Sequence, residues 1–226
     1  MSEQNKKIIA GLHRKDLTNI KFASALLDMA IEEKKDDLNF ALQQAKEVQQ
    51  IAAKESRKKN SIEFAILYWK ATLMLAPYFF EDFLYYMEKD RAPDKRFYMP
   101  RRRTLKVVVD DLQDLEDGKL DFYGLSMPPR VGKSTICIFF MAWVMGKRPN
   151  SHNAMSGHSG ILADGFYGEA LNLMELDVPE EKRQYHFLDI FPQTFLQKKS
   201  AEKKEVTLND PDRFATLTCR GIDGTW

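Results

Sequence analysis

The sequence predicts an α/β protein in which a helical N-terminal subdomain (residues 1–90) precedes a domain with a mainly parallel sheet (residues 91–226). Ten of the eleven glycines lie at or after Gly118, and residues 12–76 contain neither glycine nor proline. Little therefore interrupts helices in the first part of the chain. After Gly118, a short β-prone run, a glycine-containing loop and an apolar helix follow one another, an order typical of α/β domains.

Composition excludes several classes of protein. The 226 residues carry 34 Lys and Arg against 33 Asp and Glu, so the overall charge of +1 does not indicate a nucleic-acid partner. Hydrophobic residues make up 44%, which is enough to bury a core and excludes global disorder. Cys137 and Cys219 are too few for a disulfide scaffold and fit a reducing compartment. No apolar run is long enough to span a membrane and no secretion signal is visible, so we expect a soluble intracellular protein.

Apolar residues at helical spacing predict the elements of the first part. Two helices should meet at a turn near Asp36 and Asp37. Asn60, with Glu63 three residues later, predicts the N-cap of a third helix. The apolar face of this helix should carry Ile62, Ile66, Trp69 and Leu73. The run Tyr78 to Met87 should form another helix, and its aromatic rings are expected in the core rather than on a surface that stacks nucleic-acid bases.

A basic segment follows, from Lys89 to Lys106. Two interpretations remain open: a site for a polyanion such as nucleic acid or nucleotide phosphate, or a solvated linker. The segment has two acidic residues, Asp90 and Asp94, and eight basic residues: Lys89, Arg91, Lys95, Arg96, Arg101, Arg102, Arg103 and Lys106. Helical spacing of apolar residues then continues to Gly118.

The loop Met127 to Thr135 (MPPRVGKST) carries the most specific motif. It lies between the strand predicted at 120–126 and the helix predicted at 134–145. Its second half matches the phosphate-binding pattern G-x-x-x-x-G-K-[ST], with Met127 in place of the first glycine. The amides that such a loop offers to phosphate, at a helix N-terminus, belong to Arg130, Val131, Gly132, Lys133, Ser134 and Thr135. We expect Lys133 to reach the β and γ phosphates, Ser134 to ligate Mg²⁺ and Arg130 to add a second cation.

In these residues the sequence resembles the ATPase region of the large subunit of tailed-phage DNA-packaging terminases. In that family the phosphate loop often lacks its first glycine and contains an arginine, as MPPRVGKST does. The resemblance extends over roughly 97–226 in the order of the family. Its other segments are FYMPRRRTL (97–105), similar to the adenine-binding segment, NAMSGHSGILADGF (153–166), similar to the next strand and helix, and FATLTCRGIDGTW (214–226), similar to the strand before Walker B.

The resemblance implies a P-loop (RecA-like, ASCE-type) ATPase that uses ATP and Mg²⁺. It gives catalytic roles to Arg130 and Lys133, and it places Tyr98 and Arg102 in the adenine pocket. It also implies a motor that moves double-stranded DNA into a procapsid, with a portal protein and a small terminase subunit as partners. Such a motor forms a homo-oligomeric ring on the portal and works in the bacterial host cytoplasm.

Hydrolysis also requires acidic residues on a later strand. The resemblance places them after Trp226, so we expect this span to bind ATP without turning it over, and no nuclease domain is expected within it. The run Val107 to Asp111 (VVVDD) imitates the Walker B pattern, but it precedes the phosphate loop and continues a helical spacing. Two alternatives remain: a helicase-like DNA-dependent ATPase, and a non-hydrolysing nucleotide-binding assembly factor.

Three further patterns predict no chemistry. Ile161 stands where the hydrolase pattern G-x-S-x-G requires a glycine. His152, His158 and His186 lack partners at metal-ligand spacing, which favours ordinary polar roles. Residues 205–219 alternate as two strands about a polar turn, which predicts a hairpin.

Overall fold

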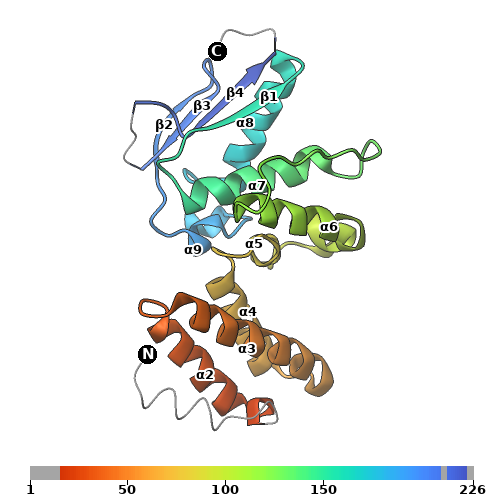
Figure 1. Cartoon of the computed structure of the whole chain (residues 1–226), viewed down its shortest axis with the longest axis vertical. Coiled ribbons are helices and arrows are strands. Elements are labelled where there is room, and N and C mark those ends of the chain that lie inside the picture. The colour runs from red at the N-terminus through yellow and green to blue at the C-terminus, as the bar shows by residue number, and fades with distance from the viewer. Residues whose placement is uncertain (1–15, 210–212, 223–226) are drawn as a thin grey trace. The chain divides into compact units, whose positions relative to one another are not determined.

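The structure is a computed structural model that describes residues 16–209 and 213–222, and these form a mixed α/β protein (Figure 1). The chain divides into two compact units, Met1–Tyr78 and Phe79–Trp226. The division falls earlier than the predicted boundary after residue 90, because α5 (Phe80–Met87) packs against α6 (Tyr98–Glu116) and α7 (Lys133–Lys147). Each unit is described by itself.

The first unit is a packed set of helices. It contains a 3₁₀ turn, η1 (Asp16–Thr18), followed by α2 (Ile20–Glu33), α3 (Leu38–Lys59) and α4 (Ile62–Leu75). The predicted turn at Asp36 and Asp37 is confirmed, since the Asp37 side chain caps α3 by accepting from the Phe40 amide at 3.0 Å. Fully buried alanines on α2 and α3 let the helices approach closely; they include Ala23, Ala41, Ala45 and Ala52.

Two expectations for α4 are wrong. Ser61, not Asn60, caps the helix, because Asn60 is left-handed (φ 47°) and ends α3. Ile62 and Ile66 are 76% and 63% exposed, whereas Phe64 and Leu67 are buried. The helix is apolar around most of its circumference, so the spacing of its apolar residues did not define the buried face.

The second unit has an aromatic core built from α5 and α7. Phe80 and Phe83 of α5 are fully buried, and the Phe80 ring lies 5.3 Å from the rings of both Phe140 and Trp143 on α7. The expectation that this aromatic run packs in the core is confirmed. At the far end of α6, the Glu116 carboxylate bonds to Arg148 and pairs with Lys147 (2.9 Å), which ties α6 to the end of α7.

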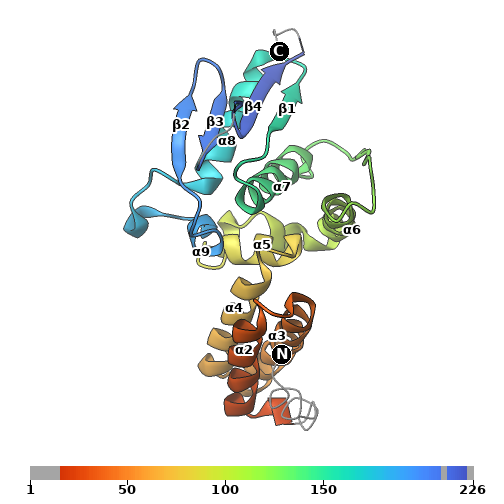
Figure 2. The same cartoon turned by 60° about the vertical axis from the view of Figure 1, so that its left-hand side comes forward.

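The sheet of the second unit has the strand order β1-β4-β3-β2 (Figure 2). Its strands are β1 (Asn153–Gly157), β2 (Leu196–Ser200), β3 (Glu205–Leu208) and β4 (Leu217–Gly221). β1 and β4 are parallel, and α8 (Gly160–Met174), which follows β1, packs on both. The remaining pairs, β2 with β3 and β3 with β4, are antiparallel, so the predicted hairpin is confirmed.

The expectation of a mainly parallel sheet is wrong for the described residues. β2, β3 and β4 follow one another through short connections, which favour antiparallel pairing, whereas a parallel pair needs a long crossover. Three short helical segments complete the unit: η2 (Pro93–Lys95), η3 (Glu180–Lys182) and α9 (Phe187–Ile190).

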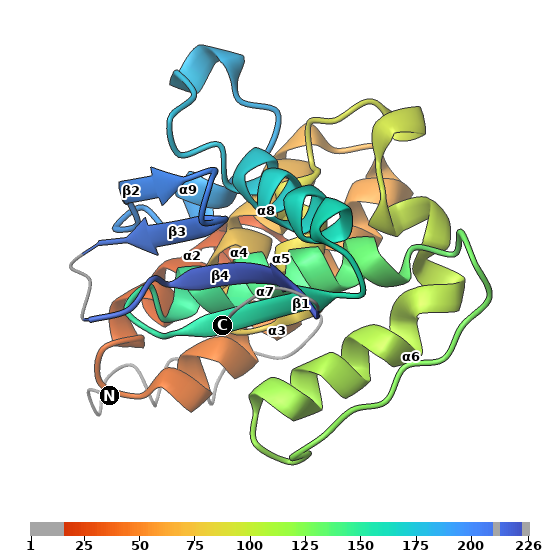
Figure 3. The same cartoon turned by 90° about the horizontal axis from the view of Figure 1, so that it is seen from above.

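The strand predicted at 120–126 is not formed. This segment is extended but lies outside the sheet, where it runs back along α6 (Figure 3). Phe122 is 83% exposed. Burial and a hydrogen bond to Asp111 of α6 raise the pKa of Tyr123 to about 12. A β-prone sequence becomes a strand only with a paired neighbour, and the described residues offer this segment none.

Candidate functional site

The phosphate-loop motif lies where the chain turns sharply into α7. Gly132 directly precedes the helix with φ 101°, and Arg130 is also left-handed with φ 65°. The first intrahelical bond of α7 runs from the Ile136 amide to the Gly132 carbonyl (2.9 Å). The amides from Lys133 to Thr135 precede that bond and have no acceptor within the helix, so they point out of its positive end.

The Lys133 ammonium closes the loop on itself. Its Nζ donates to the Met127 carbonyl at 2.8 Å, across six residues. The side chain is half-buried, and this contact holds its charge over the loop. A phosphate oxygen would be a stronger acceptor than a neutral carbonyl, because both partners would then be charged.

A pocket of about 490 Å³ opens at this end of α7. Three of its side chains are cationic, Arg101, Arg130 and Lys133, and none of the described residues that line it is a carboxylate. The full lining is Phe97, Arg101, Pro129, Arg130, Gly132, Lys133, Ser134 and Thr135. We name these eight residues the phosphate-loop pocket. Of the six residues 130–135 predicted to offer amides to phosphate, five line the pocket and Val131 does not.

Phe97 and Arg101 also line the pocket, although the resemblance singles out Tyr98 and Arg102 of the same segment. A Cβ on Gly132 would lie 2.6 Å from the Phe97 ring, so only glycine allows the ring to stand there. The ring stacks on Phe139 of α7, with centroids 5.5 Å apart and an interplanar angle of 11°. The Arg101 guanidinium lies over the same ring at 5.3 Å and donates to the Phe97 carbonyl at 3.0 Å.

Tyr98 and Arg102, the residues expected in the adenine pocket, are not part of the lining. Tyr98 is fully buried, and its hydroxyl donates to Glu81 of α5 at 2.7 Å. Arg102 bonds to the same carboxylate at 2.9 Å. Burial, reinforced by Glu81, holds the pKa of Tyr98 well above its ordinary value.

The physical reason is the helical rotation of about 100° per residue. Residues one position apart face different neighbours, whereas residues four apart share a face. Phe97 and Arg101 therefore meet the phosphate loop, while Tyr98 and Arg102 meet α5. In this structure Phe97 and Arg101 of the segment 97–105 line the pocket, whereas Tyr98 and Arg102 contact Glu81.

The other patterns noted in the sequence make ordinary structural contacts. The run Val107 to Asp111 lies within α6, and Asp110 pairs with Lys106. Ser159 caps α8 by accepting from the Leu162 amide at 3.4 Å, so it is not held as a nucleophile on a tight elbow. His186 lies between Asp90 (3.0 Å) and Asp189 (2.8 Å). Among residues 16–209 and 213–222, no group of three or more His, Cys, Asp or Glu side chains could hold a metal ion.

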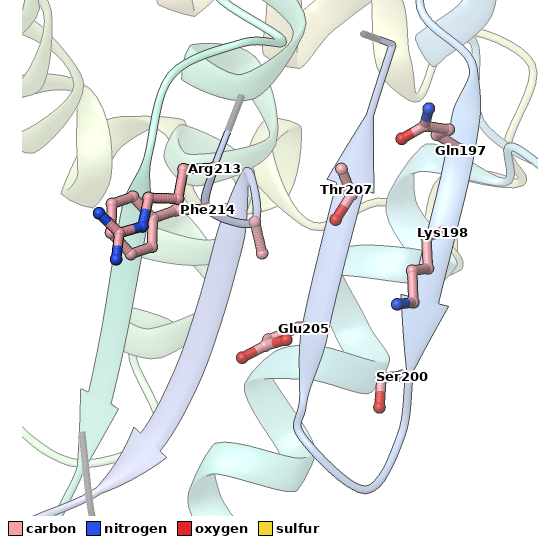
Figure 4. A pocket seen from close by; sticks show the side chains of 8 residues that line it. Gln197, Lys198, Ser200, Glu205, Thr207, Arg213 and Phe214 are labelled. Atoms are coloured by element: carbon pink, nitrogen blue, oxygen red, sulfur yellow. The ribbon is translucent and has the colours of Figure 1, made fainter. Parts of the chain in front are cut away.

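A second hollow, of about 230 Å³, lies on the sheet (Figure 4). Most of its lining is polar and comes from β2, β3 and the segment before β4: Gln197, Lys198, Ser200, Glu205, Thr207, Arg213, Phe214 and Ala215. The Glu205 carboxylate accepts from Arg220 at 3.2 Å. This hollow mixes both signs of charge, which makes it a poorer anion site than the phosphate-loop pocket.

No family profile, curated protein or solved structure matches this chain. Within the part of the chain that the structure describes, no helix is long and apolar enough to cross a membrane.

Proposed function

We propose that the second unit binds a nucleoside triphosphate at the phosphate-loop pocket. The observation that carries this proposal is the set of three cations, without a carboxylate, around the exposed amides that begin α7. Such an arrangement favours a polyanion by both charge and hydrogen bonding. Position 132 requires glycine for two reasons: its backbone is left-handed, and a Cβ would overlap the Phe97 ring.

Each residue has a defined task in this proposal. The amides of Lys133, Ser134 and Thr135 donate to phosphate oxygens, and the Lys133 ammonium exchanges the Met127 carbonyl for phosphate. Arg130, which is exposed at the mouth of the pocket, adds positive charge beside the terminal phosphate. The exposed hydroxyl of Ser134 suits Mg²⁺, which supplies charge neutralisation when bound.

We further propose that the chain is the ATP-binding part of a terminase large subunit, the motor that moves double-stranded DNA into a procapsid. The support is the order of the four resembling segments, together with the cationic pocket at the segment that matches a phosphate loop. Under this proposal the domain is a RecA-like P-loop NTPase whose partners are double-stranded DNA, a portal protein and a small terminase subunit. Its place of action would be the bacterial host cytoplasm.

A non-hydrolysing nucleotide-binding factor is the second candidate. The observation that favours it is the absence of a carboxylate from the lining of the phosphate-loop pocket in the described residues. An attacking water needs an acceptor to orient it, and guanidinium and ammonium groups are donors only. Release of phosphate from Mg-ATP by this span, lost in Lys133→Ala, would exclude this candidate.

The test of nucleotide binding is a thermal unfolding series with Mg-ATP. A ligand at a hundredfold excess over its Kd adds about 2.7 kcal/mol to the free energy of unfolding. We expect a clear rise in Tm for the wild type and a much smaller one for Lys133→Ala. Lys119→Ala is the matched control, because Lys119 is an exposed lysine of the same unit that pairs with Asp114 and Asp117. Equal responses of wild type and Lys133→Ala would refute the assignment.

The contact with DNA needs its own test, because part of the basic segment is engaged within the fold. Arg96 donates to the carbonyls of Lys89 and Arg91, and Arg102 pairs with Glu81. Arg103 is exposed. If Arg103 contacts duplex phosphates, Arg103→Gln should reduce the dependence of duplex binding on salt. An unchanged salt slope would remove Arg103 from the DNA contact.

A further inference from the structure

The segment between α5 and α6 is organised around one buried carboxylate. Glu88 is 3% exposed, and it accepts from the Phe97 amide at 2.8 and 3.0 Å and from the Tyr98 amide at 3.0 Å. Phe97 begins α6 without a side-chain cap of its own, so Glu88 satisfies the first amides of this helix from nine residues away. Arg96 donates to two carbonyls of the same segment, at 2.7 Å each, and closes it.

These bonds fix the backbone of Phe97, whose ring is a wall of the phosphate-loop pocket. The ring is held on one side by Phe139 of α7 and lies against Gly132. The Arg101 guanidinium covers it and offers a flat surface, on which a planar base can stack. Glu88 is not among the residues that line the pocket, so any effect on a ligand passes through Phe97.

Two forces act on the Glu88 carboxyl. Burial is the larger and raises its pKa, while the amides of Tyr98 and Phe97 and the nearby Arg91 and Arg96 oppose that rise. A buried carboxylate is costly to keep, and a neutral side chain could have filled this space. Its geometry suits the adjacent amides, because Oε2 accepts from both Phe97 and Tyr98 while Oε1 also accepts from Phe97.

We propose that Glu88 is a positioning residue for the nucleoside half of the ligand: by holding Phe97 and Arg101 beside Gly132, it sets how strongly the pocket prefers a nucleoside triphosphate to bare triphosphate. This inference rests on the proposed nucleotide binding. The phosphate part of the ligand depends on the loop and Lys133, and the nucleoside part depends on the wall that Glu88 holds. The two parts can therefore be weakened separately.

The experiment compares the affinity of the full chain for Mg-ATP and Mg-tripolyphosphate by calorimetry. We expect the wild type to bind ATP more tightly. Glu88→Ala should weaken ATP about tenfold, the size of a lost stacking contact, and leave tripolyphosphate within about twofold. Glu88→Gln keeps one acceptor oxygen, so its affinity for ATP should lie between those of the wild type and Glu88→Ala. Glu116→Gln, which alters a carboxylate at the other end of α6, should leave the ratio of affinities unchanged.

Phe97→Leu tests the inference without removing the buried Glu88 carboxylate, whose loss in Glu88→Ala can disturb folding. The substitution keeps an apolar side chain at position 97. It should lose the preference for ATP, and adding Glu88→Gln to it should change the ratio no further. Equal affinity of the wild type for both ligands would overturn the inference, as would Glu88 variants that weaken both ligands alike. A wild type that binds neither ligand would instead refute the proposed nucleotide site, and the inference with it.

Discussion

Gly132→Ala is the substitution whose cost follows most directly from the structure. Gly132 has φ 101°, and an added Cβ would lie 2.6 Å from Cε2 and 3.0 Å from Cζ of Phe97. The left-handed backbone costs about 1–2 kcal/mol for a residue with a Cβ. Overpacking adds about 1–3 kcal/mol, because Phe97 is held by Phe139 and by the Glu88 bonds and cannot move freely. The lower entropy of the unfolded alanine chain returns about 0.4–1 kcal/mol.

We therefore expect Gly132→Ala to lower the free energy of unfolding by about 1–5 kcal/mol. The measurement is chemical denaturation followed by fluorescence, in a variant that keeps Trp143 of α7 as its one tryptophan so that the signal reports on the second unit. Gly165→Ala is the matched control. Gly165 lies inside α8 with nothing within 4 Å of an added Cβ, so this change should stabilise the protein by about 0.5–1 kcal/mol.

A second comparison separates the two costs. In a Phe97→Leu background the smaller side chain relieves the overpacking, so Gly132→Ala should cost about 1–2 kcal/mol less there, and the backbone cost should remain. If Gly132→Ala and Gly165→Ala changed stability by the same amount, the strained turn and the contact with Phe97 would both be refuted, and with them the geometry of the pocket.

Three other results are expected. Gly146→Ala should lower the free energy of unfolding by about 1–3 kcal/mol, since its Cβ would lie 2.3 Å from the Phe191 ring. The measurement is chemical denaturation, and an unchanged free energy of unfolding would contradict that packing. Burial alone would raise the pKa of Glu116, but its two cationic partners, Arg148 and Lys147, outweigh burial and hold that pKa below its ordinary value. Glu116→Gln should therefore lower the free energy of unfolding by about 1–2 kcal/mol at pH 7. The difference from the wild type should persist above the pKa of the unfolded state and vanish as the pH falls through the pKa of the folded state. A difference that does not depend on pH would refute this account. Burial raises the pKa of the Cys137 thiol, and it raises the pKa of the Cys219 thiol to about 11. At pH 8, alkylation of Cys219 measured by mass spectrometry should run about a hundredfold slower than that of a free thiol, and equal rates would show that its burial is misplaced.

Local signals in the sequence were sufficient for the helices. The glycine-free and proline-free region forms α2, α3 and α4, and the predicted turn at Asp37 caps α3. The loop before α7 begins a helix where G-K-S-T predicted one, with Gly132 in the left-handed conformation. These features depend on contacts within a few residues, namely helical propensity, capping and the freedom of glycine.

Features that depend on distant partners were predicted less well. The segment 120–126 has the composition of a strand but has no neighbour to pair with, and the sheet is mainly antiparallel because short connections link β2, β3 and β4. The exposure of Ile62 and Ile66 likewise depends on which side of an apolar helix meets α3. A single sequence does not specify such partners.

Gly132, Lys133 and Ser134 adjoin along the chain, so local backbone geometry is enough to place them together at the start of α7. The aromatic ring and the arginine that complete the pocket come from a distant segment of the chain. Phe97 and Arg101 reach it from α6, while Tyr98 and Arg102 turn to Glu81. The rotation of α6 about its own axis, its rotational phase, determines which of these side chains face the phosphate loop. The phase is fixed by Glu88 and by packing against Phe139, contacts across nine and forty-two residues, which no local pattern in the sequence encodes.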